Sequence, residues 1–119
     1  MPHLPTEAAA RKAIPLYSGL MKYFPDALAA VASLSYQGNL QHNPGQPLHW
    51  SRDKSSDHHD TLMRHLLEAG TVDIDGHLHS TKAAWRALAA LQIEIESNNN
   101  KNPEAAAIGQ DINDDDVPF

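Results

Sequence analysis

The chain has 119 residues, a formal net charge of −6 and no cysteine. Its length is that of a single domain, and the lack of thiols excludes disulfides, thiol catalysis and thiolate metal sites. The negative charge argues against direct nucleic-acid binding, which depends on Lys and Arg contacts to phosphates. A chain this small buries only about two-thirds of its unfolded surface, so we expect a homo-oligomer, either a dimer or a tetramer.

No stretch is apolar and long enough to cross a membrane. The first five residues also lack the basic and apolar regions of a signal peptide, so we expect a cytoplasmic protein.

The first half of the chain predicts two helices and a long loop. A short helix over 6–13 is expected to stop before Pro15, because proline disfavours helix in the residue that precedes it. A second helix over 25–37 begins with a proline, which suits the first helical position, and is expected to end at Gly38. Residues 38–55 then form a loop of a length that usually carries function.

The second half predicts two more helices. The third is capped by Ser56 and closed by Gly70, and the fourth is capped by Ser80 and runs to about Ser97. The third helix has an expected apolar face of Leu62, Met63, Leu66 and Leu67, and the fourth has an expected buried stripe of Ala84, Leu88, Leu91 and Ile95. Strand signals are weak throughout. The predicted fold class is all-α, a small helical bundle.

The chain end differs in composition from the body. Residues 97–119 carry one basic and five acidic side chains, whereas the rest of the chain is nearly balanced. We therefore predict a helical domain over 1–97, whose expected catalytic residues follow below, and a flexible, disordered acidic tail over 98–119.

Polar, chemically active residues concentrate between Gly38 and Arg86. This stretch holds every histidine except His3, together with five aspartates and both tryptophans. Buried Asp and His side chains must be paired, hydrogen-bonded or metal-bound. The density therefore indicates a site that holds a hard cation and a polar, anionic ligand.

Each candidate ligand has a second interpretation. Asp57 and Asp60 are three residues apart and can reach one cation from the same side, but they also suit a helix start, and Asp60 can pair with Arg64 one turn later. Asp73 and Asp75 belong to an Asp-Ile-Asp-Gly run that can bind metal or simply form a turn. His79 is either a ligand or a helix-start residue.

The adjacent pair His59-Asp60 permits another interpretation. Phosphohydrolases of the HD type use a His, an adjacent His-Asp pair and a distant Asp, and His42 with Asp73 or Asp75 would complete that set. A packed histidine on the apolar side of its helix explains His59 equally well.

Other side chains have the chemistry to contact a nucleotide. The tryptophans can stack a base, although Trp85 also suits a core position. The candidate phosphate partners, each of which is otherwise a solvated charge, are Lys12, Lys54, Arg64 and Arg86.

A longer gapped pattern extends over roughly residues 10–96. Its segments are Ala13–Leu16, Tyr23–Pro25, Gly38–Asn39, Gln41–Gly45, Leu48–Trp50, Lys54–Ser55, Asp57–His58, Asp60, Arg64–His65, Asp75–Gly76 and Ala84–Leu88. This pattern resembles the phage dATP/dGTP diphosphohydrolases of the MazZ type, which are all-α, MazG-like nucleotide pyrophosphohydrolases.

The resemblance implies hydrolysis of dGTP or dATP to the monophosphate and pyrophosphate. It further implies supply of dGMP for phage 2-aminoadenine nucleotide synthesis in the cytoplasm of the infected host cell. Mg²⁺ or Mn²⁺ is the implied cofactor, with Co²⁺ as a further candidate, held by helical carboxylates.

The same resemblance, with the residues above, sets the expected site. The expected catalytic residues are Asp57, Asp60, Arg64 and His65, and the expected metal ligands are Asp57, Asp60, Asp75 and His79. The expected substrate-binding residues are Asn39, Gln41, His42, Trp50, Lys54 and Arg86. One departure is that MazG-like enzymes carry ExxE and ExxD pairs, whereas this chain has only Asp57-x-x-Asp60. Asp73, Asp75 and His79 could substitute for the missing pair.

The last residues, Asp111–Phe119, resemble the acidic tips of bacterial single-stranded DNA-binding proteins. Such tips place a terminal Phe in an apolar pocket and its carboxylate on an arginine. This resemblance implies docking on host proteins that bind those tips. The alternatives are a plain solubilising tail, or a non-enzymatic phage adaptor that engages host replication proteins through it.

Overall fold

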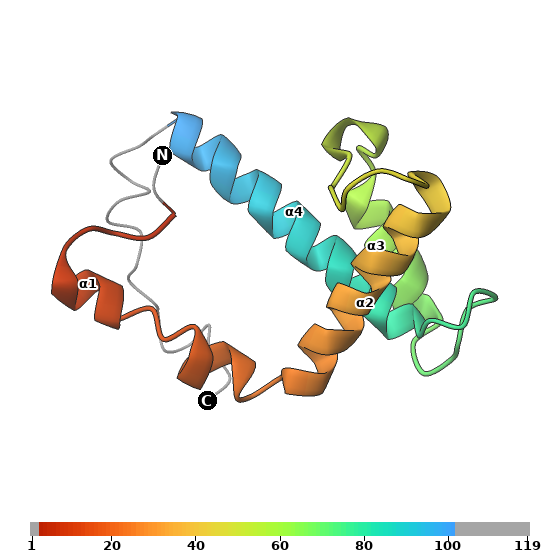
Figure 1. Cartoon of the computed structure of the whole chain (residues 1–119), viewed down its shortest axis with the longest axis horizontal. Coiled ribbons are helices and arrows are strands. Elements are labelled where there is room, and N and C mark those ends of the chain that lie inside the picture. Colours follow the sequence, from red (N-terminus) through yellow and green to blue (C-terminus); the bar gives the residue numbers. More distant parts are fainter. Residues whose placement is uncertain (1–2, 102–119) are drawn as a thin grey trace.

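The computed structural model describes residues 3–101, and these residues are helical (Figure 1). The elements in chain order are α1 (Ala8–Lys12), a π-helical turn (Tyr17–Met21), α2 (Pro25–His42), a 3₁₀ turn (Arg52–Lys54), α3 (His58–Leu67) and α4 (His79–Lys101). The predicted all-α fold class is confirmed. The predicted tail over 98–119 is wrong at its start, because residues 98–101 belong to α4. Its remainder, 102–119, including the tip resemblance, lies outside the described residues.

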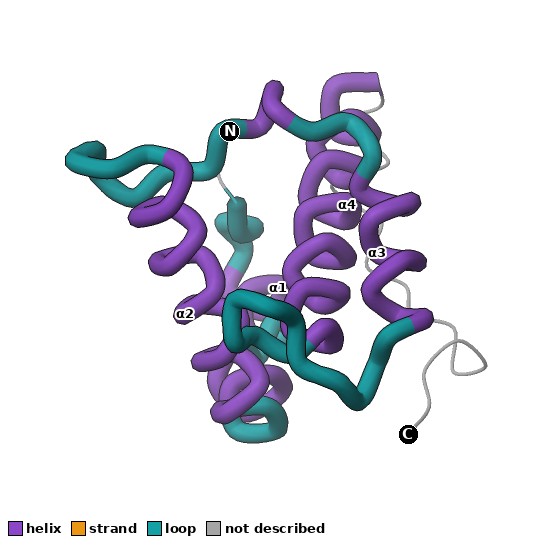
Figure 2. Tube along the Cα trace, turned by 90° about the vertical axis from the view of Figure 1, so that its right-hand side faces the viewer, coloured by secondary structure: helices purple, strands orange, loops and turns teal. Residues whose placement is uncertain are grey.

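The long helix α4 organises the fold. It packs against α3 and, to a smaller extent, against α2. Figure 2 shows α3 alongside α4, with α2 on the other side of the view. In Figure 1, α1 lies at the opposite end of the molecule from α3. The functional candidates on α2, α3 and α4 are therefore gathered in one half of the structure.

Helix α2 is longer than predicted. Gly38 lies inside the helix, whose last residue is His42, instead of ending it at Gln37. A glycine in a helix interior costs only about 1 kcal/mol, so it weakens a helix without stopping it. The break comes from Pro44, because Asn43 before it leaves the helical region with φ −133° and ψ 56°.

Helices α3 and α4 also differ from prediction at their ends. Asp57, not Ser56, occupies the position before α3, and its carboxylate accepts a hydrogen bond from Ser55 Oγ at 2.8 Å. Helix α4 begins at His79, ahead of the expected cap Ser80, and continues beyond Ser97 to Lys101. The asparagines that follow Ser97 are weak helix formers but do not interrupt the backbone pattern.

A tight turn joins α3 to α4. Gly70 and Gly76 have positive φ values of 92° and 88°, which favour glycine. The backbone N–H of Asp73 donates to His77 at 2.8 Å, and that of His79 donates to Thr71 at 3.1 Å. This turn folds the chain back on itself, so Asp73 and His79 come close to the end of α3.

The apolar faces predicted for α3 and α4 are not buried in the single chain. On α3 the buried residues are His58 and Thr61, whereas Leu66 is 48% and Leu67 86% exposed. The expected stripe on α4 is wrong in the same way, since Leu88, Leu91 and Ile95 are 45–50% exposed and Ala84 is also exposed. The buried hydrophobic residues are instead Ala83 and Ala89.

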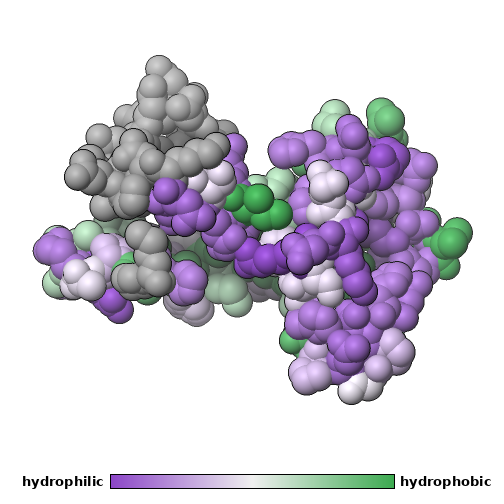
Figure 3. All heavy atoms as spheres, turned by 90° about the horizontal axis from the view of Figure 1, so that it is seen from above, coloured by the Kyte–Doolittle hydropathy of each residue, from purple (hydrophilic) through white to green (hydrophobic). Residues whose placement is uncertain are grey.

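The molecular surface reflects this burial pattern. The face in Figure 3 is mostly hydrophilic, with hydrophobic side chains at several separate places. Within residues 3–101, none of the helices combines the length and the hydropathy that a bilayer span requires.

Candidate functional site

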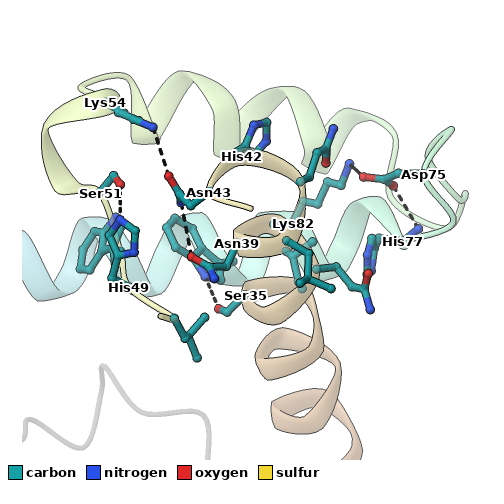
Figure 4. A pocket seen from close by; sticks show the side chains of 18 of the residues that line it. Ser35, Asn39, His42, Asn43, His49, Ser51, Lys54, Asp75, His77 and Lys82 are labelled. Atoms are coloured by element: carbon teal, nitrogen blue, oxygen red, sulfur yellow. Dashed lines mark hydrogen bonds and ion pairs between the residues drawn. The ribbon is translucent and has the colours of Figure 1, made fainter. Parts of the chain in front are cut away.

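A pocket of about 820 Å³ lies between α2, the loop that follows it, and the side of α4 (Figure 4). Its volume is within the range of sites that bind small molecules. Lys54 and Asn43 lie toward one end of the view, and Asp75, His77 and Lys82 lie toward the other. The pocket thus joins the long loop to the turn before α4.

The pocket gathers all the residues that were expected to bind substrate. The last turn of α2 contributes Asn39, Gln41 and His42, the loop contributes Trp50 and Lys54, and α4 contributes Arg86. His65 and Asp75, from the expected catalytic and metal sets, also line it. Residues up to 47 positions apart in sequence, Asn39 and Arg86, therefore face one space.

The charge of the lining is opposite to that of the protein. Lys54, Lys82 and Arg86 line the pocket with a single carboxylate, Asp75, whereas the whole chain has a net charge of −6. A concave surface lined by one sign of charge concentrates ligands of the opposite sign. Because Lys82 is paired with Asp73 and Asp75, Lys54 and Arg86 supply the positive charge that suits an anionic ligand.

Two tryptophans contribute to the apolar part of the lining, together with Leu34, Leu40 and Leu48. The Trp50 and Trp85 rings pack edge to face, with centroids 5.6 Å apart and an interplanar angle of 81°. Trp85 Nε1 donates to Ser35 Oγ on α2 at 2.8 Å, and the Arg52 guanidinium lies 4.3 Å from the Trp50 ring centroid. Tryptophan rings can stack a base, and here Arg52 covers one face of Trp50.

Arg86 connects the pocket to the start of α3. Its Nη1 donates to Ser55 Oγ at 2.8 Å and to His58 Nδ1 at 3.0 Å. Since a guanidinium only donates, His58 Nδ1 must accept, and the proton of neutral His58 lies on Nε2. That buried Nε2 has no hydrogen-bond partner. Burial, and secondarily the Arg86 charge, hold the pKa of His58 below its usual value.

Asn39 has a structural as well as a pocket position. It is buried, its Nδ2 donates to the Gln46 carbonyl at 3.1 Å, and its Oδ1 accepts from Asn43 at 3.4 Å. Lys54 Nζ in turn donates to Asn43 Oδ1 at 3.5 Å. These bonds attach the loop to the end of α2 and hold Lys54 at the pocket.

Three side chains with metal-ligand chemistry converge beside the pocket. Ligand atoms of His65, Asp73 and His79 all lie within 4.8 Å of one another. His65 Nδ1 is 2.9 Å from His79 Nδ1, and His79 Nδ1 is 3.9 Å from Asp73 Oδ2. On its other side, His79 Nε2 is 2.8 Å from Glu68 Oε2. Burial lowers the pKa of His65, as do His79 and Lys82.

Lys82 joins the two aspartates of the turn. Its Nζ is 2.7 Å from Asp73 Oδ2 and 2.7 Å from Asp75 Oδ2. The Lys82 hydrogen bond, with a further bond from the Ile74 amide, lowers the pKa of Asp73 to about 2. Although burial opposes it, the bonds to Asp73 and Asp75 raise the pKa of Lys82. All three groups are ionised at neutral pH.

The expected helical carboxylates lie apart from this cluster. Asp57 contacts Ser55 and lies 3.4 Å from Arg64, whose Nη2 also donates to Thr61 at 2.8 Å. The Ser55 and Arg64 bonds lower the pKa of Asp57. Asp60 is exposed. Among the described residues, the metal-ligand group includes His79 from the expected ligand set but not Asp57, Asp60 or Asp75.

The set of the HD type is likewise not assembled. His42 lines the pocket, whereas His59 and Asp60 are exposed on α3, and the metal-ligand group found in the described residues contains neither of them.

Sequence reasoning left out Glu68, Lys82 and Ser35 as site residues, and it gave Asp73 only a secondary place. The helical spacing was a usable signal for Lys82, which follows His79 by three residues on α4. Glu68 follows the last residue of α3 and contacts His79, which spacing does not reveal. No comparable signal existed for Ser35, whose partner Trp85 is 50 residues away.

The chain was compared with models of protein families, with curated proteins and with solved structures, and none of them matched it.

Proposed function

We propose that this protein is a metal-dependent hydrolase of purine deoxynucleoside triphosphates, dGTP or dATP, which produces the monophosphate and pyrophosphate. The observation that carries the proposal is the composition of the pocket. It combines two tryptophans with three cationic side chains in a chain of net negative charge, and it contains all six residues expected to contact substrate.

Each part of a nucleotide has a partner of suitable chemistry in this pocket. The base stacks on Trp50, beside Trp85. The phosphates are met by Lys54 and Arg86, whose charges line the same space. A divalent ion supplies the remaining chemistry when bound, since it activates water for attack at the α-phosphorus and neutralises the leaving pyrophosphate.

The biological setting of the proposal rests on the sequence resemblance. The hydrolase would supply dGMP for phage 2-aminoadenine nucleotide synthesis and lower dGTP and dATP in the cytoplasm of the infected host cell. It would act as a homo-oligomer, because the single chain leaves the apolar faces of α3 and α4 exposed.

Turnover of dGTP with Mn²⁺ or Mg²⁺ tests the activity and the pocket together. Lys54→Ala should lower kcat/KM for dGTP about tenfold or more, because a charge-assisted contact to phosphate is lost. Lys22→Ala removes an exposed lysine that does not line the pocket and serves as the matched control. Equal losses in both variants, or no loss in either, would contradict the assignment of this pocket.

The alternative function, a non-enzymatic adaptor, is favoured by the terminal sequence Asp111–Phe119. Deleting Phe119 would then abolish binding to host proteins that recognise the tips of single-stranded DNA-binding proteins, while dGTP turnover stayed unchanged. A protein that turns over no purine deoxynucleotide but loses such a partner on deletion of Phe119 would be an adaptor.

A further inference from the structure

The cluster beside the pocket brings together three segments of the chain. His65 lies near the end of α3, Asp73 lies in the turn, and His79 is the first residue of α4. The ligand-to-metal distance for imidazole is about 2.1 Å, so a 2.9 Å separation of the two Nδ1 atoms corresponds to an angle of about 90° at a shared ion. The 3.9 Å between His79 Nδ1 and Asp73 Oδ2 also allows one ion between them.

The tautomer of His79 leaves a lone pair in the cluster. A carboxylate accepts hydrogen bonds, so His79 Nε2 donates its proton to Glu68 Oε2 at 2.8 Å. In neutral His79 the Nδ1 atom is then unprotonated and directed at His65 and Asp73. A carboxylate on the outer nitrogen of a histidine is the usual arrangement around metal-ligating histidines, because it fixes the orientation of the ring.

Without an ion, a single hydrogen between the two Nδ1 atoms explains the contact of His65 with His79. His79 Nδ1 accepts, so the hydrogen between the two histidines must come from His65 Nδ1. An ion would replace that proton and take both lone pairs. A neutral imidazole is the form that binds a metal.

The surrounding charge is suited to a dication. Glu68, Asp73 and Asp75 contribute three negative charges near the cluster, and Lys82 and Arg86 contribute two positive charges. The sum is −1. Lys82 also holds Asp73 in place through its 2.7 Å contact, so the carboxylate is ordered before any ion arrives.

We propose that His65, Asp73 and His79 bind one first-row divalent transition-metal ion, with Glu68 as the positioning residue for His79. Two imidazoles and one carboxylate favour Mn²⁺, Fe²⁺, Co²⁺ or Zn²⁺ over Mg²⁺, which prefers oxygen ligands. Because His65 also lines the pocket, the bound ion lies at its wall. That an ion binds here follows from the geometry alone. That this ion is the catalytic metal rests on the proposed function.

Titration of the tag-free, full-length protein with Co²⁺, followed by visible absorption and by metal analysis, tests the site without nucleotide. We expect one ion per chain and loss of binding in His65→Ala and His79→Ala. Glu68→Gln should weaken binding about 10- to 100-fold, since it removes only the outer partner of His79. His59→Ala, an exposed histidine on the same helix, is the matched control and should bind as the wild type does.

Two results would overturn the site. One is Co²⁺ affinity that is unchanged in Glu68→Gln and His65→Ala while circular dichroism shows both variants folded. The other is loss of binding in Asp60→Asn with full binding in His65→Ala, which would move the ion to the helical carboxylates. Turnover of dGTP in the same variants distinguishes the metal site from the proposed hydrolase activity. If no ion binds at this cluster but dGTP is still hydrolysed, the metal site is contradicted and the hydrolase activity is not.

Discussion

His58 illustrates how much of this structure depends on single polar side chains. It is 6% exposed, accepts from Arg86 through Nδ1, and packs near both tryptophans with ring centroids 6.3 Å and 6.4 Å away. The cost of burying it is reduced by keeping it neutral. His58 thereby links the start of α3 to the pocket through Arg86 without contacting the pocket itself.

Replacing His58 should change how stability responds to pH. Its pKa in the folded protein is lower than in the unfolded chain, because of burial and Arg86, so acidification below about 6.5 protonates the unfolded state first. The stability present above that value is therefore lost as the pH falls. His58→Gln keeps an acceptor for Arg86 but removes this proton uptake, so its free energy of unfolding should fall less between about pH 7.5 and about pH 5.

Urea unfolding at a series of pH values measures the effect. His65 also has a lowered pKa and is present in both proteins. The comparison is therefore between the slopes of the free energy of unfolding against pH. An unchanged slope in His58→Gln would show that His58 is not held neutral by burial.

At the scale of elements, α4 holds the fold together through small residues. Ala83 and Ala89 are each 4% exposed and are the buried hydrophobic residues of the described chain. Small side chains let a neighbouring helix approach closely, and interiors of this kind tolerate added volume poorly. Trp85, on the same helix, donates to Ser35 and so ties α4 to α2.

Enlarging a buried alanine should therefore destabilise the fold. Ala89→Leu inserts extra carbon atoms at a closed helix contact and should cost about 1–3 kcal/mol in the free energy of unfolding. Ala87→Leu makes the same change at an exposed position of the same helix and should alter stability by less than about 0.5 kcal/mol. Chemical denaturation measures the free energy of unfolding of both variants. Equal losses of stability would contradict the burial of Ala89.

The sequence predicted element types better than it predicted which faces are buried. Proline positions and polar breaks located α2, α3 and α4, and the substrate residues expected from the resemblance all reached one pocket. Helical periodicity placed the apolar residues of α3 on one side of the helix, but it does not show whether that side packs within the chain. The meeting of His65 with Asp73 and His79 depends on a turn whose path is set by Gly70 and Gly76, and spacing alone does not reveal it.

At the scale of the whole molecule, the described chain lacks a core of large side chains. No large side chain within residues 3–101 is fully buried, and Met63, Leu66 and Leu67 on α3 are 48–86% exposed. A contiguous exposed apolar face of this kind marks an interaction site. A second copy of the chain is the expected occupant, because it would supply the burial that one chain of this size does not achieve.

Light scattering coupled to size-exclusion chromatography tests this assembly. The wild type should elute as a dimer or tetramer, and Leu67→Glu should shift it toward the monomer because a charge in an apolar interface is costly. Ile74→Glu alters an equally exposed apolar residue at the tip of the turn and should leave the assembly intact. A monomeric wild type, or dissociation caused by Ile74→Glu alone, would contradict a second copy on this face.

Hydrolysis of dGTP in water enriched in ¹⁸O, with Mn²⁺ present and with the phosphorus products identified by mass spectrometry, shows whether water attacks the α-phosphorus. Attack of water at the α-phosphorus predicts dGMP that carries one ¹⁸O atom and unlabelled pyrophosphate. Release of deoxyguanosine and triphosphate, label in the pyrophosphate, or no turnover of any purine deoxynucleotide would contradict it.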